Sequence, residues 1–197
     1  ALNFLITGVG GQGTILAGDL LSAVGLEAGY DVKKSDILGL AVRGGAVVGH
    51  VRWGERVHSP IVPEGQVDYL VAFEVLEGLR WLHQVRPDGA VLLNQQEIHP
   101  VTVSGGLADY PDPATVDQVL VQRPGLALRV PGLDIARQLG NPRVLNVVLL
   151  GVLSACLPVP AQVWQRVLQD RVPARYVDLN QSAFHMGRSW AHERISP

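Results

Sequence analysis

Short apolar runs and longer segments of helical period alternate along most of the chain. Apolar runs of about four to eight residues predict buried strands, and apolar residues recurring every three or four positions predict helices. The predicted strands are residues 3–7, 30–35, 46–53, 56–61, 67–73, 90–94, 101–103 and 127–130. The predicted helices are residues 14–28, 74–85, 114–122, 134–139, 142–157, 161–170 and 177–192. This alternation predicts an α/β fold, a mainly parallel Rossmann-like sheet with helices on both faces and a helical C-terminal third.

One pair of predicted strands departs from the alternation. Residues 46–53 and 56–61 flank Gly54 and Glu55, which suit a two-residue Gly-X turn. The sequence therefore predicts one antiparallel hairpin inserted in the sheet. Residues 36–45, just before it, have no clear period and predict a loop.

The helix predicted at residues 142–157 is apolar almost all round. Its polar residues are Arg143, Asn146 and Ser154, which form a thin stripe. A helix of this kind lies in a core or in a subunit interface. Because the chain has no internal repeat, low-complexity tract or linker, we expect one domain over residues 1–197.

Composition favours a folded protein that works inside an assembly. Apolar residues make up 47% of the chain and charged residues only 17%, which argues against disorder and suggests apolar surface covered by a partner. The formal charge of −2 and the few aromatic residues do not favour a nucleic-acid partner. The most apolar segment, residues 144–157, is shorter than the roughly 20 residues of a membrane span.

The cysteine content limits the redox chemistry of the chain. Cys156 is the sole cysteine, so this chain alone cannot form a disulfide, a Cys₄ zinc site or the ligand set of an iron–sulfur cluster. Sparse cysteine is typical of a reducing cytosol, and residues 1–7 enter a strand without the charged start of a signal peptide. We therefore expect a cytoplasmic protein.

The sequence GVGGQGT, residues 8–14, lies between a predicted strand and a predicted helix. Gly8, Gly10 and Gly13 match the pattern G-x-G-x-x-G. Glycines allow positive φ angles and close backbone approach, and a helix N-terminus carries partial positive charge. Together they favour a phosphate, a pyrophosphate or a carboxylate. The alternative is that the glycines only form a tight turn against the sheet.

A dinucleotide fits this loop only in part. In dinucleotide-binding folds, an acid about 20 residues further on, near the end of the second strand, binds the ribose. Here Asp31 comes too early in the strand, and Asp36 follows two lysines, Lys33 and Lys34. Lysines suit a phosphate better than a neutral ribose. A P-loop fits less well, because Thr14 and its neighbour replace the Lys-Ser/Thr pair.

A second candidate binding segment is Arg43-Gly44-Gly45, in the predicted loop. An arginine beside two glycines can offer its guanidinium fork to a phosphate or carboxylate, although a surface arginine at a bulge has the same sequence. Glu74 and Glu77 follow a strand, where α/β sites often lie, but acids are also common in the first turn of a helix. No catalytic residue and no metal ligand is predicted.

Four stretches together resemble one family. They are GVGGQGT at 8–14, VKKSDILGLAVRGGAVVGHVRWG at 32–54, HSPIVPEGQVDYLVAFEVLEGLR at 58–80 and LGNPRVLNVVLLGVL at 139–153. In this order they resemble the gamma subunit, or fused gamma domain, of 2-oxoacid:ferredoxin oxidoreductases. Within that family the chain is most similar to the small beta subunit of indolepyruvate:ferredoxin oxidoreductase.

The resemblance implies an assembled enzyme that oxidatively decarboxylates a 2-oxoacid, forms an acyl-coenzyme A and reduces ferredoxin. Thiamine diphosphate and iron–sulfur clusters carry that chemistry. This chain departs from the catalytic parts of the family, because Gly18-Asp19 is followed by Leu20 rather than by the glycine of a thiamine signature, and cluster cysteines are missing. We therefore expect the cofactors on a catalytic partner subunit, access to ferredoxin through the complex, and no activity of this chain alone.

For the glycine loop, the resemblance leads to the hypothesis that it holds the phosphate part of coenzyme A. The candidate binding residues are Gly8, Gly10, Gly11, Gln12, Gly13, Thr14, Lys33, Arg43, Gly44 and Gly45. Two alternatives stay open: a stand-alone NAD(P)-binding module, and a scaffold subunit without a ligand. Co-purified nucleotide would favour the module, whereas an empty chain that forms a homodimer or seeks a partner would favour the subunit.

Overall fold

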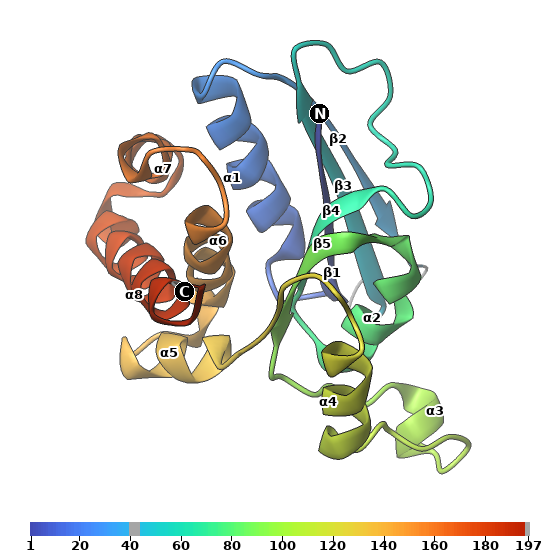
Figure 1. Ribbon diagram of the computed structural model, residues 1–197. Helices are drawn as coiled ribbons and strands as arrows, with labels where there is room; N and C mark the ends of the chain where they lie inside the picture. Colours follow the sequence, from blue (N-terminus) through green and yellow to red (C-terminus); the bar gives the residue numbers. More distant parts are fainter. Residues whose placement is uncertain (40–43, 196–197) are drawn as a thin grey trace.

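A computed structural model describes residues 1–39 and 44–195, and in this part the chain forms one six-stranded sheet with helices on both faces (Figure 1). The strands are β1 (Leu2–Val9), β2 (Asp31–Leu38), β3 (Ala46–Gly54), β4 (Val67–Ala72), β5 (Val85–Asn94) and β6 (Ala127–Val130). The α-helices are α1 (Thr14–Glu27), α2 (Val75–Arg80), α3 (Val101–Ser104), α4 (Pro113–Val121), α5 (Gly132–Gln138), α6 (Leu145–Ala155), α7 (Ala161–Arg171) and α8 (Val177–Ile195). Short 3₁₀ turns are η1 (Leu82–Gln84), η2 (Pro142–Val144) and η3 (Ala174–Tyr176).

The sheet order is β2-β3-β1-β4-β5-β6. Strands β1, β4, β5 and β6 are parallel, whereas β3 is antiparallel to both of its neighbours, β1 and β2. The mainly parallel α/β sheet is therefore confirmed, and β2 and β3 form an antiparallel pair within it. Because β1 is central, its carboxyl end and the glycine loop that follows lie in the middle of one edge of the sheet.

Successive side chains of β1 point to opposite faces and fill two apolar cores. Phe4 and Ile6 belong to the larger core, which α1, α6, α7 and α8 cover. Leu5, between them, belongs to the smaller core on the other face, under α2 (Figure 1). Helices on both faces are thus confirmed.

Helix α6 lies inside the larger core. All its residues from Leu145 to Ser154 are buried, as expected of a helix that is apolar almost all round. It packs closely on α8, because a Cβ at Gly187 would lie 2.1 Å from the backbone oxygen of Val148. The helical C-terminal third is therefore stacked on the sheet through α6. Among the described residues, no helix combines the length and apolarity that a bilayer crossing needs.

The hairpin partner was predicted wrongly. Strand β3 pairs with β2, from Asp31 opposite Gly54 to Leu38 opposite Val47, and not with residues 56–61. Residues 55–66 form no strand. Strand β2 also takes up residues 36–38, which the sequence had predicted as loop. The reason is that β2 is an edge strand in which no residue is fully buried, so it lacks the apolar run of a buried strand.

Two further elements differ from prediction. Residues 101–103 form the start of α3 rather than a strand, although two of the three are valines. Val101 is 88% exposed, so its β-branched side chain finds no sheet to pack on. The helix predicted over residues 74–85 ends at Arg80, and a 3₁₀ turn then leads into β5.

Candidate glycine-loop site

The loop between β1 and α1 requires glycine at several positions. Gly11 and Gly13 have positive φ angles of 106° and 85°, which other residues rarely adopt. Position 8 has no room for a side chain, because a Cβ there would lie 2.8 Å from the Cβ of Phe73 and 2.8 Å from the Cγ2 of Thr14. The sequence pattern thus reflects real steric demands of the turn.

The start of α1 presents backbone donors. Gly13 is the N-cap and carries no capping side chain, and the first turn contains no acid. The first backbone hydrogen bond of the helix joins the Ala17 N–H to the Gly13 oxygen at 3.0 Å. Among the described residues, the N–H groups of Thr14, Ile15 and Leu16 have no acceptor, as is usual for a helix start. An anion is the ligand that such an end favours.

Gln12 braces the loop from within. Its Oε1 accepts a hydrogen bond from the Val9 N–H at 2.8 Å. Its Nε2 donates to the Phe73 backbone oxygen at 3.0 Å and to Gln96 Oε1 at 2.9 Å. Asn94, fully buried, also donates to the Phe73 oxygen, at 2.8 Å. The side chain of Gln12 therefore holds the loop against the ends of β4 and β5.

The two predicted glycine segments are brought together. The Gly10 N–H donates to the Gly45 oxygen at 2.9 Å, and the Gly44 N–H donates back to the Gly10 oxygen at 3.4 Å. Arg43, the cation of that segment, lies outside the described residues. The glycines that precede β3 thus border the glycine loop directly.

Lys33 is not brought to the loop. It lies level with Arg52 and Asn3, six residues before the end of β1, which is about 20 Å along the strands. Its Nζ contacts Asp31 at 2.6 Å. Thus the structure places this candidate at the other end of the sheet from the glycines.

Lys34 and Asp36 form an ion pair beside α1. Lys34 Nζ lies 2.5 Å from Asp36 Oδ2 and 2.8 Å from Asp19 Oδ1. Burial alone would lower the pKa of Lys34, but the hydrogen bonds to the two carboxylates outweigh it, so its pKa is raised. Asp36 is therefore held by a lysine and is not a free acceptor for the hydroxyls of a ribose.

Two hollows flank the glycine loop. One, of about 500 Å³, lies between the start of α1 and the end of β2, and its lining is mostly apolar, with Ile15, Leu16, Leu38 and the carboxylate of Asp19. The other, of about 400 Å³, lies between the loop and the start of α6. Its polar lining consists of Gln12, Gln96, Arg143 and Asn146.

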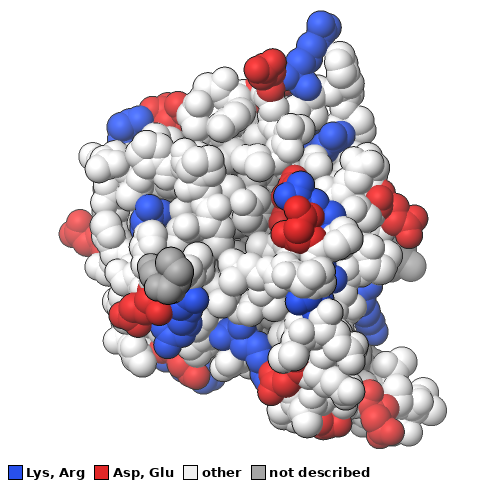
Figure 2. Space-filling model, viewed as in Figure 1, with Lys and Arg blue, Asp and Glu red and all other residues white. Residues whose placement is uncertain are grey.

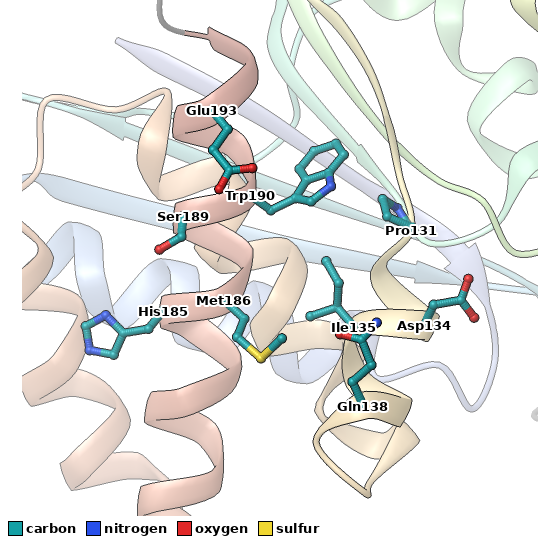
Figure 3. Close-up of a pocket in the computed structure, with 9 residues that line it drawn as sticks. All are labelled: Pro131, Asp134, Ile135, Gln138, His185, Met186, Ser189, Trp190 and Glu193. Carbon is teal, nitrogen blue, oxygen red and sulfur yellow. The ribbon is translucent and has the colours of Figure 1, made fainter.

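A third hollow, of about 600 Å³, lies between α5 and α8 (Figure 3). Ile135 of α5 and Met186 and Trp190 of α8 form its apolar part, and Asp134 and Glu193 supply carboxylates. Its lining contains two acids and no lysine or arginine, which disfavours an anion there.

The two acids after β4 are held within the fold. Glu74 is buried and caps α2, accepting from the Glu77 N–H at 2.8 Å, from the Ile98 N–H at 3.1 Å and from the Tyr110 hydroxyl. Glu77 contacts Arg80 at 2.7 Å, and burial raises the pKa of its carboxyl. Both acids therefore fit the start of a helix, the second of the two interpretations that their sequence position allows.

Charges of both signs are interspersed over the surface. Figure 2 shows lysine and arginine beside aspartate and glutamate on the face in view, with broad uncharged areas between them. In the part of the chain that the structure describes, no group of histidine, cysteine and carboxylate side chains is arranged to bind a metal ion. The glycine loop is thus the best candidate for a binding site.

Sequence reasoning missed three residues near this loop. Gln96, Arg143 and Asn146 line the hollow on its α6 side. Arg143 and Asn146 were noticed as polar residues of an apolar helix, but they follow the loop by about 130 residues in sequence. Only the packing of α6 beside α1 brings them to it.

Comparisons with known proteins agree on one family. The family model described as pyruvate ferredoxin/flavodoxin oxidoreductase matches residues 3–190. Indolepyruvate oxidoreductase subunit IorB of Pyrococcus horikoshii is 36% identical over 197 residues, which cover 98% of each chain. The gamma subunit of a keto/oxoacid ferredoxin oxidoreductase from Geobacter sulfurreducens has the same fold, with a TM-score of 0.73 at 22% identity over 98% of this chain and 99% of that one.

A larger enzyme contains the same fold as one part. In the 2-oxoglutarate:ferredoxin oxidoreductase of Magnetococcus marinus, the match has a TM-score of 0.77 at 22% identity and covers 100% of this chain but 32% of that one. That structure was solved with 2-oxoglutarate, coenzyme A and succinyl-CoA bound.

Proposed function

This chain belongs to the pyruvate ferredoxin/flavodoxin oxidoreductase family, and we propose that it is an accessory subunit of a 2-oxoacid:ferredoxin oxidoreductase that acts on indolepyruvate or a similar 2-oxoacid. The similarity to IorB over nearly the full length of both chains is the observation that carries this proposal. The reaction would join the acyl group to coenzyme A and pass electrons to ferredoxin. The chain would work in the cytoplasm, as part of a heteromer.

The chemistry of the chain supports an accessory role. Its one cysteine, Cys156, cannot ligate an iron–sulfur cluster by itself, since such clusters need several thiolates. Burial raises the pKa of the Cys156 thiol to about 11, so it is a poor nucleophile at neutral pH. Thiamine diphosphate and the clusters are therefore assigned to a catalytic partner subunit, and this chain alone would be inactive.

The glycine loop is proposed to hold a phosphate group of coenzyme A. The donors are the N–H groups of the first turn of α1, from Thr14 to Leu16, and this turn contains no acid. Arg43 is proposed to add a guanidinium from the neighbouring glycine segment. When bound, coenzyme A supplies the thiol that accepts the acyl group, and the role of this chain is to position the nucleotide end.

Apolar surface beside the loop supports a partner subunit. Ile15 and Leu16, on the first turn of α1, and Ile37 and Leu38, at the end of β2, are large apolar side chains with 40–58% of their surface exposed. Three of the four line the same hollow. A cluster of exposed apolar side chains is typical of a protein interface. We propose that the catalytic subunit covers it.

The test uses the purified complex with its catalytic subunit. Coenzyme A is titrated calorimetrically into complexes that contain the wild-type chain, Gly11→Ala or Arg43→Ala. We expect both variants to bind coenzyme A more weakly. Alanine does not readily adopt the positive φ angle of Gly11, and Arg43→Ala removes a cation. Arg166→Ala is the control, because Arg166 pairs with Glu27 at the opposite end of α1. Equal affinities in all four complexes would refute the role of the loop.

A stand-alone NAD(P)-binding module has less support. The acid that would bind the ribose, Asp36, is held by Lys34. Mass spectrometry of the isolated chain under native conditions distinguishes the two functions. We expect a chain without NAD(P), free or as a homodimer, and co-purified dinucleotide would favour the module instead.

A further inference from the structure

Asn146, at the start of α6, has an unused donor next to the glycine loop. Only 3% of the residue is exposed. Its Oδ1 accepts a hydrogen bond from the Val147 N–H at 3.0 Å, which fixes the orientation of the amide. The Nδ2 group makes no hydrogen bond to another described residue, and Asn146 lines the hollow on the α6 side of the loop. It faces Gly13, with 3.4 Å between Nδ2 and the position of a Cβ there.

Arg143 brings a cation to the same hollow. It lies in η2, three residues before Asn146, and its side chain lines the hollow. In the described part of the chain, its guanidinium makes no ion pair with a carboxylate, unlike those of Arg80, Arg86 and Arg129. An arginine without a carboxylate partner is available to an external anion.

Gln96 completes a lining that consists of donors. Its Oε1 already accepts from Gln12, which leaves its NH₂ group for another partner. No aspartate or glutamate lines this hollow, whereas Asp19 lines the one on the other side of the loop. A phosphate is therefore electrostatically favoured on the α6 side and disfavoured beside Asp19.

We infer that the anion binds between the glycine loop and the start of α6, and that Arg143 and Asn146 donate hydrogen bonds to it. The ligand class is a phosphate or pyrophosphate group. Its identification as the phosphate part of coenzyme A rests on the proposed function, but the anion site itself rests on these donors. The volume of about 400 Å³ suffices for a pyrophosphate and part of the molecule that carries it.

The test follows inorganic pyrophosphate binding to the full chain, labelled with ¹⁵N, through the backbone N–H signals of Thr14 and Ile15. Arg143→Gln removes the guanidinium from an exposed position, where folding is not at risk. Asn146→Asp keeps the acceptor for the Val147 N–H but replaces the donor by a negative charge. Arg166→Gln is the control with the same loss of charge, because Arg166 lies on α7 and pairs with Glu27 at the far end of α1.

We expect pyrophosphate to shift the Thr14 and Ile15 signals in the wild type and in Arg166→Gln. The apparent Kd should rise about ten-fold in Arg143→Gln and at least as much in Asn146→Asp, as for the loss of a charge-assisted hydrogen bond. No binding by the wild type, equal Kd values in all four proteins, or shifts confined to Leu38 and its β3 neighbour Val47 would overturn the inference.

Coenzyme A binding by the complex separates this inference from the proposed function. If pyrophosphate binding depends on Arg143 and Asn146 but coenzyme A does not bind the complex, the anion site is supported and the identification of its ligand as coenzyme A is wrong. If coenzyme A binds the complex but pyrophosphate binding does not depend on Arg143 and Asn146, the proposed function stands and the inference fails.

Discussion

The side-chain amide of Gln12 donates a hydrogen bond to the backbone oxygen of Phe73 at 3.0 Å and so ties the glycine loop to the end of β4. The same side chain accepts from the Val9 N–H and donates to Gln96. The loop is thus held in place before any ligand arrives. Such preorganisation lowers the entropic cost of binding an anion.

Replacing Gln12 by alanine should destabilise the fold. The Val9 N–H loses its acceptor, whereas the Phe73 oxygen keeps the bond from Asn94. A net hydrogen bond contributes about 1 kcal/mol, so we expect a loss of about 1–3 kcal/mol in urea denaturation. Gln118→Ala, at an exposed site on α4, should change stability by less than about 0.5 kcal/mol. A loss no larger than that of this control would show that Gln12 does not brace the loop.

His50 should make stability depend on pH. It is buried in β3, and its Nδ1 accepts a hydrogen bond from the Val62 N–H at 3.3 Å. Burial lowers the pKa of His50 below its ordinary value of 6.5. The unfolded state therefore binds a proton at higher pH than the folded state, so stability is full above pH 6.5 and falls as the pH drops towards the folded pKa.

The variant His50→Asn isolates this effect. Asparagine keeps an acceptor near the position of Nδ1 but does not titrate. We expect the free energy of unfolding, measured by urea denaturation between pH 5 and pH 7.5, to depend less on pH in His50→Asn than in the wild type. His192→Asn, at an exposed site of α8, should show the same pH dependence as the wild type. Identical pH dependence in all three proteins would contradict the role of His50.

Leu38 should contribute to assembly rather than to folding. Its side chain is 58% exposed at the end of β2, beside Ile15 and Leu16 in the lining of one hollow. We expect Leu38→Asp to unfold at nearly the wild-type temperature but to bind the catalytic subunit at least ten-fold more weakly, because a carboxylate would be buried in the interface. Leu107→Asp, at a site that is 83% exposed, should bind like the wild type. Normal assembly of Leu38→Asp would place the interface elsewhere.

The parts that could be predicted from sequence are those set by local rules. The β1–loop–α1 unit was predicted because an apolar run, glycines with steric demands and a helical segment follow one another directly. The apolar helix α6 was predicted because its composition fits only a buried site, in a core or in an interface. In both cases the neighbouring residues in sequence are also the physical cause of the structure.

The parts that failed depend on contacts between distant segments. The polar edge strand β2 pairs with β3, which no apolar pattern reveals. Lys33 was grouped with the glycine loop because it stands close to the position expected for a ribose-binding acid at the end of the second strand. Strand β2 instead continues to Leu38, which leaves Lys33 near its start, at the other end of the sheet. Arg143 and Asn146 could not be assigned to the loop from sequence, because only the packing of α6 against the sheet beside α1 brings them there.

The most direct test of the central claim compares the chain alone, the catalytic subunit alone and the two together in an assay of 2-oxoacid- and coenzyme A-dependent ferredoxin reduction. We expect turnover only when both are present, with the spectra of thiamine- and cluster-bound protein confined to the catalytic subunit. Turnover of a 2-oxoacid by this chain alone, or full activity of the catalytic subunit without it, would contradict the assignment of an accessory subunit.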